Sequence, residues 1–279
     1  MVKDETRYAC SPEEVKNMDT ARLRETFLID VLFEPETVRW TYSHYDRFMA
    51  GGIHPVNQSL RLEPLDQLKS DYFLERRELG IINVGGAGKI QVNGETIELD
   101  YKDALYIGKG NHEVIFSSND PASPAKFYVN SAPAHREFPV KKVSRKEAEV
   151  VTLGSPETSN HRTINKLLVN STVKTCQLQM GMTELKPGSV WNTMPAHTHD
   201  RRMEVYFYFE VPGGQSVCHF MGQAQETRHI WMQNEQAVIS PPWSIHAGAG
   251  TSNYTFIWGM AGENLDYDDM DKWAINDLR

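Results

Sequence analysis

Two histidines stand two residues apart in the run His197-Thr198-His199, and this spacing can bring both imidazoles to one metal ion. On a β-strand, residues i and i+2 face the same side, so the two rings can converge. Such a pair also arises by chance on surface strands. Glu204 and His246, further along the sequence, extend the pair to a set of four possible ligands.

Glu204 and His246 can join the pair only if the chain bends. Glu204 lies an odd number of residues after His199 and would face away on a straight strand, so we predict a turn or bulge over Asp200-Arg201-Arg202. His246 follows the turn-forming Pro241-Pro242. Three neutral imidazoles and one carboxylate suit zinc, although Fe, Mn, Ni and Co also accept these ligands. We predict one metal ion per chain, most consistent with zinc, on His197, His199, Glu204 and His246.

The first half of the chain contains a looser copy of this pattern without the histidine pair. Arg76-Arg77-Glu78 opens a strand-like run, as Arg201-Arg202-Met203-Glu204 does later, and His112 and His246 each lie near a turn. Similar offsets with drifting loop lengths indicate duplicated β domains. We therefore predict a half without a metal motif at residues 1–140 and a metal-binding half at residues 141–279. His112 is expected to serve packing or a hydrogen bond.

Short strands must position these residues over most of the chain. Strand-like runs alternate with turn residues from about Val31 to Ala261, and Asn93-Gly94 between two alternating runs predicts a hairpin with a type I′ turn. Ser11-Pro12-Glu13-Glu14 has the form of a capping box and predicts a short helix. Residues 145–149 could form a single helical turn. The predicted fold is mainly β, with two β-sandwich or barrel halves and short terminal helices.

Composition and charge exclude several classes of function. The 279 residues are 40% hydrophobic and 24% charged, which is ordinary for a globular protein. The formal net charge of -8 argues against binding nucleic acid or an anionic membrane through bulk electrostatics, so an anionic substrate needs a local basic pocket. No apolar run could span a bilayer and the start of the chain is charged, so we expect a cytoplasmic location. The three cysteines are far apart and predict no redox or zinc-ribbon motif.

Two arginines and a tyrosine beside the predicted ligands are candidates for substrate binding. Arg201 and Arg202 could hold a sugar carboxylate in a bidentate pair. Because Arg76-Arg77 recurs in the half without the histidine pair, a salt bridge within the scaffold explains these arginines equally well. Tyr206 shares a strand face with Tyr208 and could line a pocket, although core packing is the more common role for buried aromatic side chains.

A charged strand-like run supplies further candidates. Glu226 and Arg228 share one face of this run and His229 lies on the other. Glu226 and His229 are candidates for proton transfer, and Arg228 is a candidate for substrate binding. A solvated charged strand is the simpler interpretation of all three.

The two ligand-bearing segments, His197 to Glu204 and Pro241 to His246, resemble the two metal motifs of the cupin superfamily. Trp243 and Gly250 depart from the common pattern, which has Gly and Asn at these positions. A more specific resemblance, to the 5-keto-4-deoxyuronate isomerases of pectin breakdown, covers essentially the whole chain. Its motifs are Phe73–Gly80, Trp191–Pro195, Gln225–Ile230 and Thr255–Met260. This resemblance implies a bicupin fold, zinc on the four predicted ligands and a homo-oligomer, specifically a hexamer.

The resemblance also implies the reaction, an aldose–ketose isomerisation of 5-dehydro-4-deoxy-D-glucuronate to 3-deoxy-D-glycero-2,5-hexodiulosonate. Such a reaction moves a proton between adjacent carbons through an enediolate, whose negative charge a divalent cation can stabilise. Two other interpretations stay open, because the cupin scaffold hosts many functions. One is an Fe(II) dioxygenase, which would consume oxygen. The other is a non-catalytic sugar-acid-binding cupin whose four-ligand zinc is structural.

Overall fold

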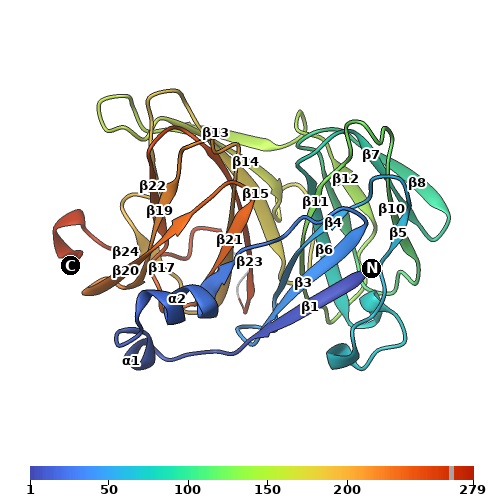
Figure 1. The fold of residues 1–279 in the computed structure, drawn as a ribbon, viewed down its shortest axis with the longest axis horizontal. Coiled ribbons are helices and arrows are strands. Elements are labelled where there is room, and N and C mark those ends of the chain that lie inside the picture. The colour runs from blue at the N-terminus through green and yellow to red at the C-terminus, as the bar shows by residue number, and fades with distance from the viewer. Residues whose placement is uncertain (264–266) are drawn as a thin grey trace. The chain divides into compact units, whose positions relative to one another are not determined.

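A computed structural model describes residues 1–263 and 267–279 and divides them into two units (Figure 1). Unit 1 comprises Met1–Thr6, Val31–Glu149 and Lys166–Met180, and unit 2 comprises Arg7–Asp30, Val150–Asn165 and Gly181–Arg279. The division at residue 140 into two halves stays a proposal. Among the described residues, no helix combines the length and the apolar character that a membrane crossing requires.

The first two sheets consist of strands from the N-terminal part of the chain. The seven-stranded sheet has the order β1 (Val2–Arg7), β3 (Thr37–Ser43), β4 (Met49–His54), β11 (Phe127–Pro133), β6 (Arg77–Asn83), β9 (Ala104–Ile107) and β12 (Lys141–Val143). The four-stranded sheet has the order β5 (Leu60–Arg61), β10 (Val114–Ser118), β7 (Gly88–Val92) and β8 (Glu95–Leu99).

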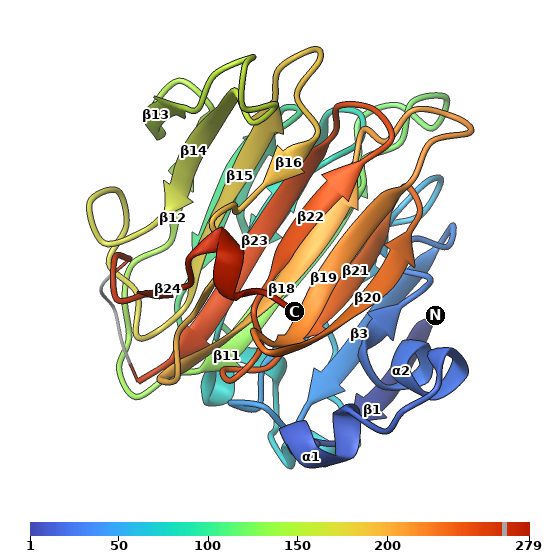
Figure 2. The same ribbon diagram turned by 90° about the vertical axis from the view of Figure 1, so that its left-hand side faces the viewer.

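The next two sheets repeat this arrangement (Figure 2). The second seven-stranded sheet has the order β13 (Glu149–Leu153), β14 (Arg162–Leu168), β15 (Gln179–Leu185), β23 (Thr255–Gly262), β18 (Arg202–Phe209), β21 (Gln236–Ser240) and β2 (Leu28–Ile29). The second four-stranded sheet has the order β16 (Trp191–Asn192), β22 (Ala247–Gly250), β19 (Val217–Gln223) and β20 (Glu226–Met232). A further two-stranded sheet pairs β17 (His197–Thr198) with β24 (Asp271–Lys272).

The matching strand orders confirm the predicted duplication and the mainly β fold class. Strand β6, which follows Arg76, occupies the place in the first large sheet that β18 occupies in the second, between two antiparallel neighbours. Strand β10, which follows His112, likewise corresponds to β22, which follows His246. Equivalent segments that the sequence related only loosely therefore occupy equivalent positions.

The helices are short, and most lie near the ends of the chain. Helix α1 (Pro12–Val15) begins at the predicted capping box, in which Ser11 and Glu14 bond each other's backbone N–H groups. Helix α2 (Thr20–Phe27), capped by Asp19, was not predicted. The 3₁₀ helices are η1 (Asp66–Leu68), η2 (Phe73–Glu75) and η3 (Ile275–Asp277). Residues 145–148 form a turn and bend, not the suggested helical turn.

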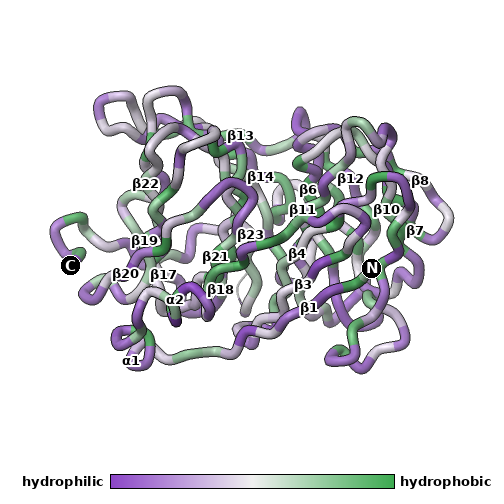
Figure 3. The backbone as a smooth tube through the Cα atoms, in the orientation of Figure 1, coloured by the Kyte–Doolittle hydropathy of each residue, from purple (hydrophilic) through white to green (hydrophobic). Residues whose placement is uncertain are grey.

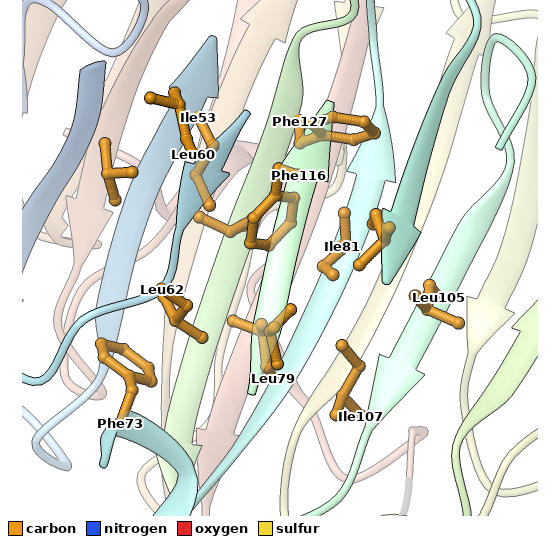
Figure 4. Packing of buried hydrophobic residues seen from close by; sticks show 14 of the residues in the cluster. Ile53, Leu60, Leu62, Phe73, Leu79, Ile81, Leu105, Ile107, Phe116 and Phe127 are labelled. Carbon is orange, nitrogen blue, oxygen red and sulfur yellow. The ribbon is translucent and has the colours of Figure 1, made fainter. Parts of the chain in front are cut away.

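The predicted hairpin and the hydrophobic cores follow from the alternation of side chains. Strands β7 and β8 pair around Asn93 and Gly94, which both have positive φ, as a type I′ turn requires. Figure 3 shows hydrophobic stretches along β18 and β21, whose residues are all buried. In unit 1, residues from both sheets form one cluster (Figure 4) that includes Leu79, Ile81, Phe116 and Phe127. Burial of such side chains stabilises each sheet pair by roughly 1.5–3 kcal/mol per large residue.

Candidate metal centre

A tight turn brings the histidine pair and the glutamate together. Strand β17 ends at Thr198, the backbone N–H of Arg202 donates to the carbonyl oxygen of His199 at 3.2 Å, and β18 begins at Arg202. Asp200 and Arg201 form the turn, as predicted. Because the turn interrupts the strand, the alternation of side chains after it no longer continues the alternation before it. Glu204 therefore points to the same side as the two histidines.

The four predicted ligands converge at one point in unit 2. Their donor atoms all lie within 4.8 Å of one another. The Oε2 atom of Glu204 lies 3.0 Å from Nε2 of His199 and 3.0 Å from Nε2 of His246. The Nε2 atom of His246 also lies 2.9 Å from Nε2 of His197. Ligand bonds of about 2.1 Å in a tetrahedral zinc site imply donor separations of roughly 3.4 Å, close to those seen here.

The hydrogen bonds around the imidazoles fit a cation. The Nδ1 atom of His199 lies 2.9 Å from the carbonyl oxygen of Arg202, so Nδ1 must carry the proton. In the neutral tautomer, the Nε2 lone pair then points to the centre that His199 shares with Glu204. The Nδ1 atom of His246 likewise lies 3.3 Å from Oγ of Ser240 and leaves Nε2 for the centre. Imidazoles that bind a metal ion are commonly oriented in this way, with the other ring nitrogen bonded to an oxygen of the protein.

The protonation states of the site also suit a metal ion. Burial, together with the nearby His246, lowers the pKa of the His197 imidazole to about 2. Burial also lowers the pKa of His246. For Glu204, burial alone would raise the pKa of the carboxyl, but His246 and His199 outweigh it and hold the pKa below its usual range. Neutral imidazoles and an ionised carboxylate are the forms that bind a divalent cation.

A cavity of about 260 Å³ adjoins the four-ligand site. Three of the ligands, His197, His199 and Glu204, line it. Aromatic and apolar side chains form most of the remaining wall, namely Leu153, Ile164, Met194, Pro195, Tyr206, Phe256, Trp258, Met260, Tyr267 and Met270. A partly open, mainly apolar pocket with a few polar groups is typical of a site for a small molecule.

Two arginines line the cavity, and only one of them has a carboxylate partner among the described residues. Arg202 is 1% exposed, and its guanidinium donates to the carbonyl oxygen of Tyr267 at 2.9 Å and pairs with Asp269 at 3.2 Å. Arg162 is half-buried and donates to the carbonyl oxygen of Asn160. It has no carboxylate partner among residues 1–263 and 267–279. Burial lowers the pKa of Arg162, because its charge is poorly solvated. Arg162 is therefore the cationic side chain of this wall that an anion would stabilise most.

The other candidates from the sequence lie outside this cavity wall. Arg201 is exposed and pairs with Glu263 at 3.1 Å. Arg228 donates to Glu226 at 2.8 Å and to the carbonyl oxygen of Lys16. Glu226 and His229 are exposed on β20. The structure thus brings Arg202 and Tyr206 to the cavity and leaves four candidates outside it: Arg201, Glu226, Arg228 and His229.

The sequence interpretation missed several cavity residues. Arg162 lies on β14, and Asp268 and Lys272 lie near the end of the chain. The carboxylate of Asp268 makes no hydrogen bond or ion pair with any described residue. None of these residues belongs to a motif or a regular spacing, so no local pattern could have identified them.

In unit 1, Leu79 occupies the position on β6 that Glu204 has on β18, two residues after the arginine that begins each strand. The neighbouring glutamate of that half, Glu78, is held by other groups of the protein. The carboxylate of Glu78, on β6, is fully buried and accepts hydrogen bonds from the backbone N–H groups of residues 176, 177 and 178 at 2.7–2.8 Å. The hydroxyl of Tyr106 donates a fourth at 2.7 Å. His112 is exposed and stacks on Tyr72, 4.0 Å between ring centres. The glutamate is therefore satisfied by the protein itself.

His219, a buried histidine outside the ligand set, predicts acid sensitivity. It is fully buried on β19, its Nδ1 lies 2.8 Å from the Tyr208 hydroxyl, and burial lowers its pKa to about 3. The unfolded chain takes up this proton near pH 6.5 and the folded chain does not. Its contribution to the free energy of unfolding therefore falls as pH drops below 6.5, by up to about 1.4 kcal/mol per pH unit.

We expect His219→Gln to reduce the slope of stability against pH by about that amount in metal-free protein. The measurement is urea unfolding at pH 7 and pH 5. His112→Gln, at an exposed site, is the matched control and should keep the original slope. An unchanged slope in His219→Gln would contradict the prediction.

Comparison with known proteins gives full-length matches. Residues 29–276 match the KduI/IolB family. A 4-deoxy-L-threo-5-hexosulose-uronate ketol-isomerase of Formosa agariphila is 64% identical over 277 residues, which are 99% of each chain. A 4-deoxy-L-threo-5-hexosulose-uronate ketol-isomerase 1 of Bacteroides thetaiotaomicron is 58% identical over 275 residues, 99% of this chain and 98% of that one.

Two solved structures share the fold. An IolB-like protein of Salmonella typhimurium LT2 has a TM-score of 0.66 at 18% identity and covers 81% of this chain and 86% of its own. An oxalate decarboxylase of Lactobacillus farciminis has a TM-score of 0.56 at 10% identity, and the match covers 81% of this chain and 79% of that one. At these identities the likeness concerns the fold alone. It agrees with the duplicated bicupin architecture predicted from the sequence.

Proposed function

This chain belongs to the KduI/IolB family, and we propose that it is a ketol-isomerase that converts 4-deoxy-L-threo-5-hexosulose uronate to 3-deoxy-D-glycero-2,5-hexodiulosonate. The observation that carries the proposal is the 64% identity to a ketol-isomerase of that name over 99% of both chains. The cavity beside the four-ligand site gives the reaction a location. The substrate and product fit a role in the breakdown of pectin and other uronates.

The metal of this proposal is zinc, held by His197, His199, Glu204 and His246. When bound, it would act as a Lewis acid toward the carbonyl and neighbouring hydroxyl oxygens of the substrate. Three of the four ligand residues line the cavity, so a molecule in the cavity lies directly against the centre. That arrangement favours a catalytic role over a purely structural zinc.

Arg162 is the proposed anchor for the substrate carboxylate. It lies in the cavity wall, is partly desolvated and has no carboxylate partner among the described residues. A planar guanidinium can bind a carboxylate through two parallel hydrogen bonds. Arg202 contributes less charge to a ligand, since Asp269 already neutralises it. Its position beside His199 fits a role in holding the turn.

We expect Arg162→Met to raise KM by roughly 10- to 100-fold, because a charge-assisted pair contributes about 1.5–3 kcal/mol. Methionine keeps the apolar stem, so folding and zinc content should persist. Initial rates over a range of substrate concentrations measure the effect. Arg201→Met, at an exposed arginine paired with Glu263, is the control and should leave KM within about twofold. The reverse pattern would make Arg201 the anchor.

Asp268 is the proposed residue for proton transfer. Among the described residues of the cavity wall it is the one carboxylate that is neither a predicted ligand nor hydrogen-bonded. Burial raises the pKa of Tyr206 well above its usual value and also raises the pKa of Tyr267, so neither phenol readily gives up its proton. A carboxylate in contact with the cavity can take a proton from one substrate carbon and return it to the next.

The function is tested by incubating the protein with the keto-uronate and following the product by NMR. Zinc-loaded protein should convert the substrate at the same rate with and without oxygen, and chelated protein should lose turnover. Oxygen uptake with iron dependence would instead support the dioxygenase alternative. Tight binding of the keto-uronate without product would support the non-catalytic sugar-acid-binding cupin.

Two further parts of the proposal concern the state of the protein. We propose a homo-oligomer, specifically a hexamer, as the resemblance to the isomerases implies. Light scattering coupled to gel filtration measures the molar mass that tests it. A cytoplasmic location also remains a proposal.

A further inference from the structure

His197 lies outside the seven-stranded and four-stranded sheets of unit 2. Glu204 lies in β18 between the paired strands β21 and β23, and His246 directly precedes β22. His197 instead lies in the two-residue strand β17, which among the described residues pairs with β24 alone. In that pairing His197 is opposite Lys272 and Thr198 is opposite Asp271.

The segment that contains β24 is attached to the rest of unit 2 at further points. We call residues 267–279 the strap segment; in Figure 2 it is the dark red run that includes β24 and ends at the label C. The N–H of Trp273 donates to the carbonyl oxygen of Ala196 at 3.0 Å, next to His197. The N–H of Arg279 donates to the carbonyl oxygen of Ala224 at 2.9 Å.

Apolar packing joins the strap segment to the fourth ligand. Trp273 and Leu278 pack against a buried cluster that includes Ala196 and Ile245. Ile245 is 1% exposed and directly precedes His246. The two strap side chains therefore pack against a cluster that contains residues adjacent to two different ligands, His197 and His246.

A hydrogen-bonded arginine joins the strap segment to the remaining two ligands. The guanidinium of Arg202 binds the carbonyl oxygen of Tyr267 and the carboxylate of Asp269. The backbone carbonyl oxygen of Arg202 accepts a hydrogen bond from Nδ1 of His199. Glu204 lies two residues after Arg202. Tyr267, Asp268, Met270 and Lys272 also line the cavity.

We propose that the strap segment preorganises the metal centre, so that its docking and metal binding stabilise each other. The inference rests on the proposed metal site. A ligand held in place before binding loses little conformational freedom when the ion arrives, whereas a free one must be ordered at that moment. Because the coupling is reciprocal, a bound ion also holds the strap segment against unit 2.

The test compares zinc affinity in the full chain and in a variant that lacks residues 271–279. Competition with a chromogenic chelator measures the affinity, and we expect a loss of roughly 10- to 100-fold, the range found when groups behind metal ligands are removed. Trp273→Ala removes one side chain only, and its zinc affinity should fall about tenfold. This variant still tests the proposal if the shortened chain folds poorly. Ile275→Ala, at a 63% exposed residue of the same segment, is the control and should bind zinc normally.

Hydrogen exchange of the full chain supplies a second readout that is independent of activity. Zinc should slow exchange of the backbone amides at residues 271–279 by at least about tenfold, because a bound ion stabilises the docked state. Equal zinc affinity in the full chain, Trp273→Ala and the shortened variant would overturn the role of the strap segment. Absence of zinc binding in the full chain would instead overturn the metal centre of the proposed function.

Discussion

His246→Ala and His197→Ala are expected to lose bound zinc, from about one ion per chain to less than roughly a tenth, together with turnover. Both imidazoles contribute an Nε2 atom to the centre, 2.9 Å apart. Three remaining ligands would hold the ion weakly, and the loss of its Lewis acidity, worth several kcal/mol, would lower kcat by more than about a thousandfold. Elemental analysis of dialysed protein and the NMR assay measure the two effects.

The control for this prediction comes from the other half of the chain. His112 corresponds to His246 in the repeat, but it stacks on Tyr72 at an exposed position. Glu78, on β6 of the other sheet of unit 1, is already hydrogen-bonded. His112→Ala should therefore keep its zinc and its activity. Equal zinc retention in all three variants would mean that the ion, if bound, lies elsewhere.

Asp268→Asn is expected to lower kcat by about a hundredfold to ten-thousandfold, the usual contribution of a positioned acid or base. Asparagine keeps the size of the side chain but cannot exchange a proton. KM and zinc content should change little, because Asp268 is neither a predicted ligand nor the proposed carboxylate anchor. Steady-state rates with metal analysis on the same sample separate these quantities.

Asp271→Asn provides the matched control for Asp268→Asn. Asp271 lies three residues further along the same segment, on β24, and is exposed away from the cavity at the metal centre. Its replacement should leave kcat unchanged. Similar losses in both variants would indicate a general effect of charge on the segment. No loss in either variant would exclude Asp268 as the residue for proton transfer.

Local patterns predicted most of the strands, helix α1 and the ligand set, but not helix α2. Alternating side chains predicted the strands, Asn93-Gly94 predicted a hairpin, and Ser11 to Glu14 predicted helix α1. These patterns work because turn geometry and capping depend on a few neighbouring residues. Glu204 lies an odd number of residues after His199, so the two could face the same side only if the chain turned between them, and the structure contains that turn.

The sequence by itself determined the mainly β duplicated fold and the four side chains that converge at the centre, since their residue types and spacing constrain both. Only the tertiary structure decided which other side chains face that centre. Arg162 on β14 and Asp268 near the end of the chain are about a hundred residues apart, yet both line one cavity, while Arg201, four residues from His197, points to solvent. Sheet order and the path of the strap segment fix such neighbours, and these depend on contacts between distant strands that no local spacing records.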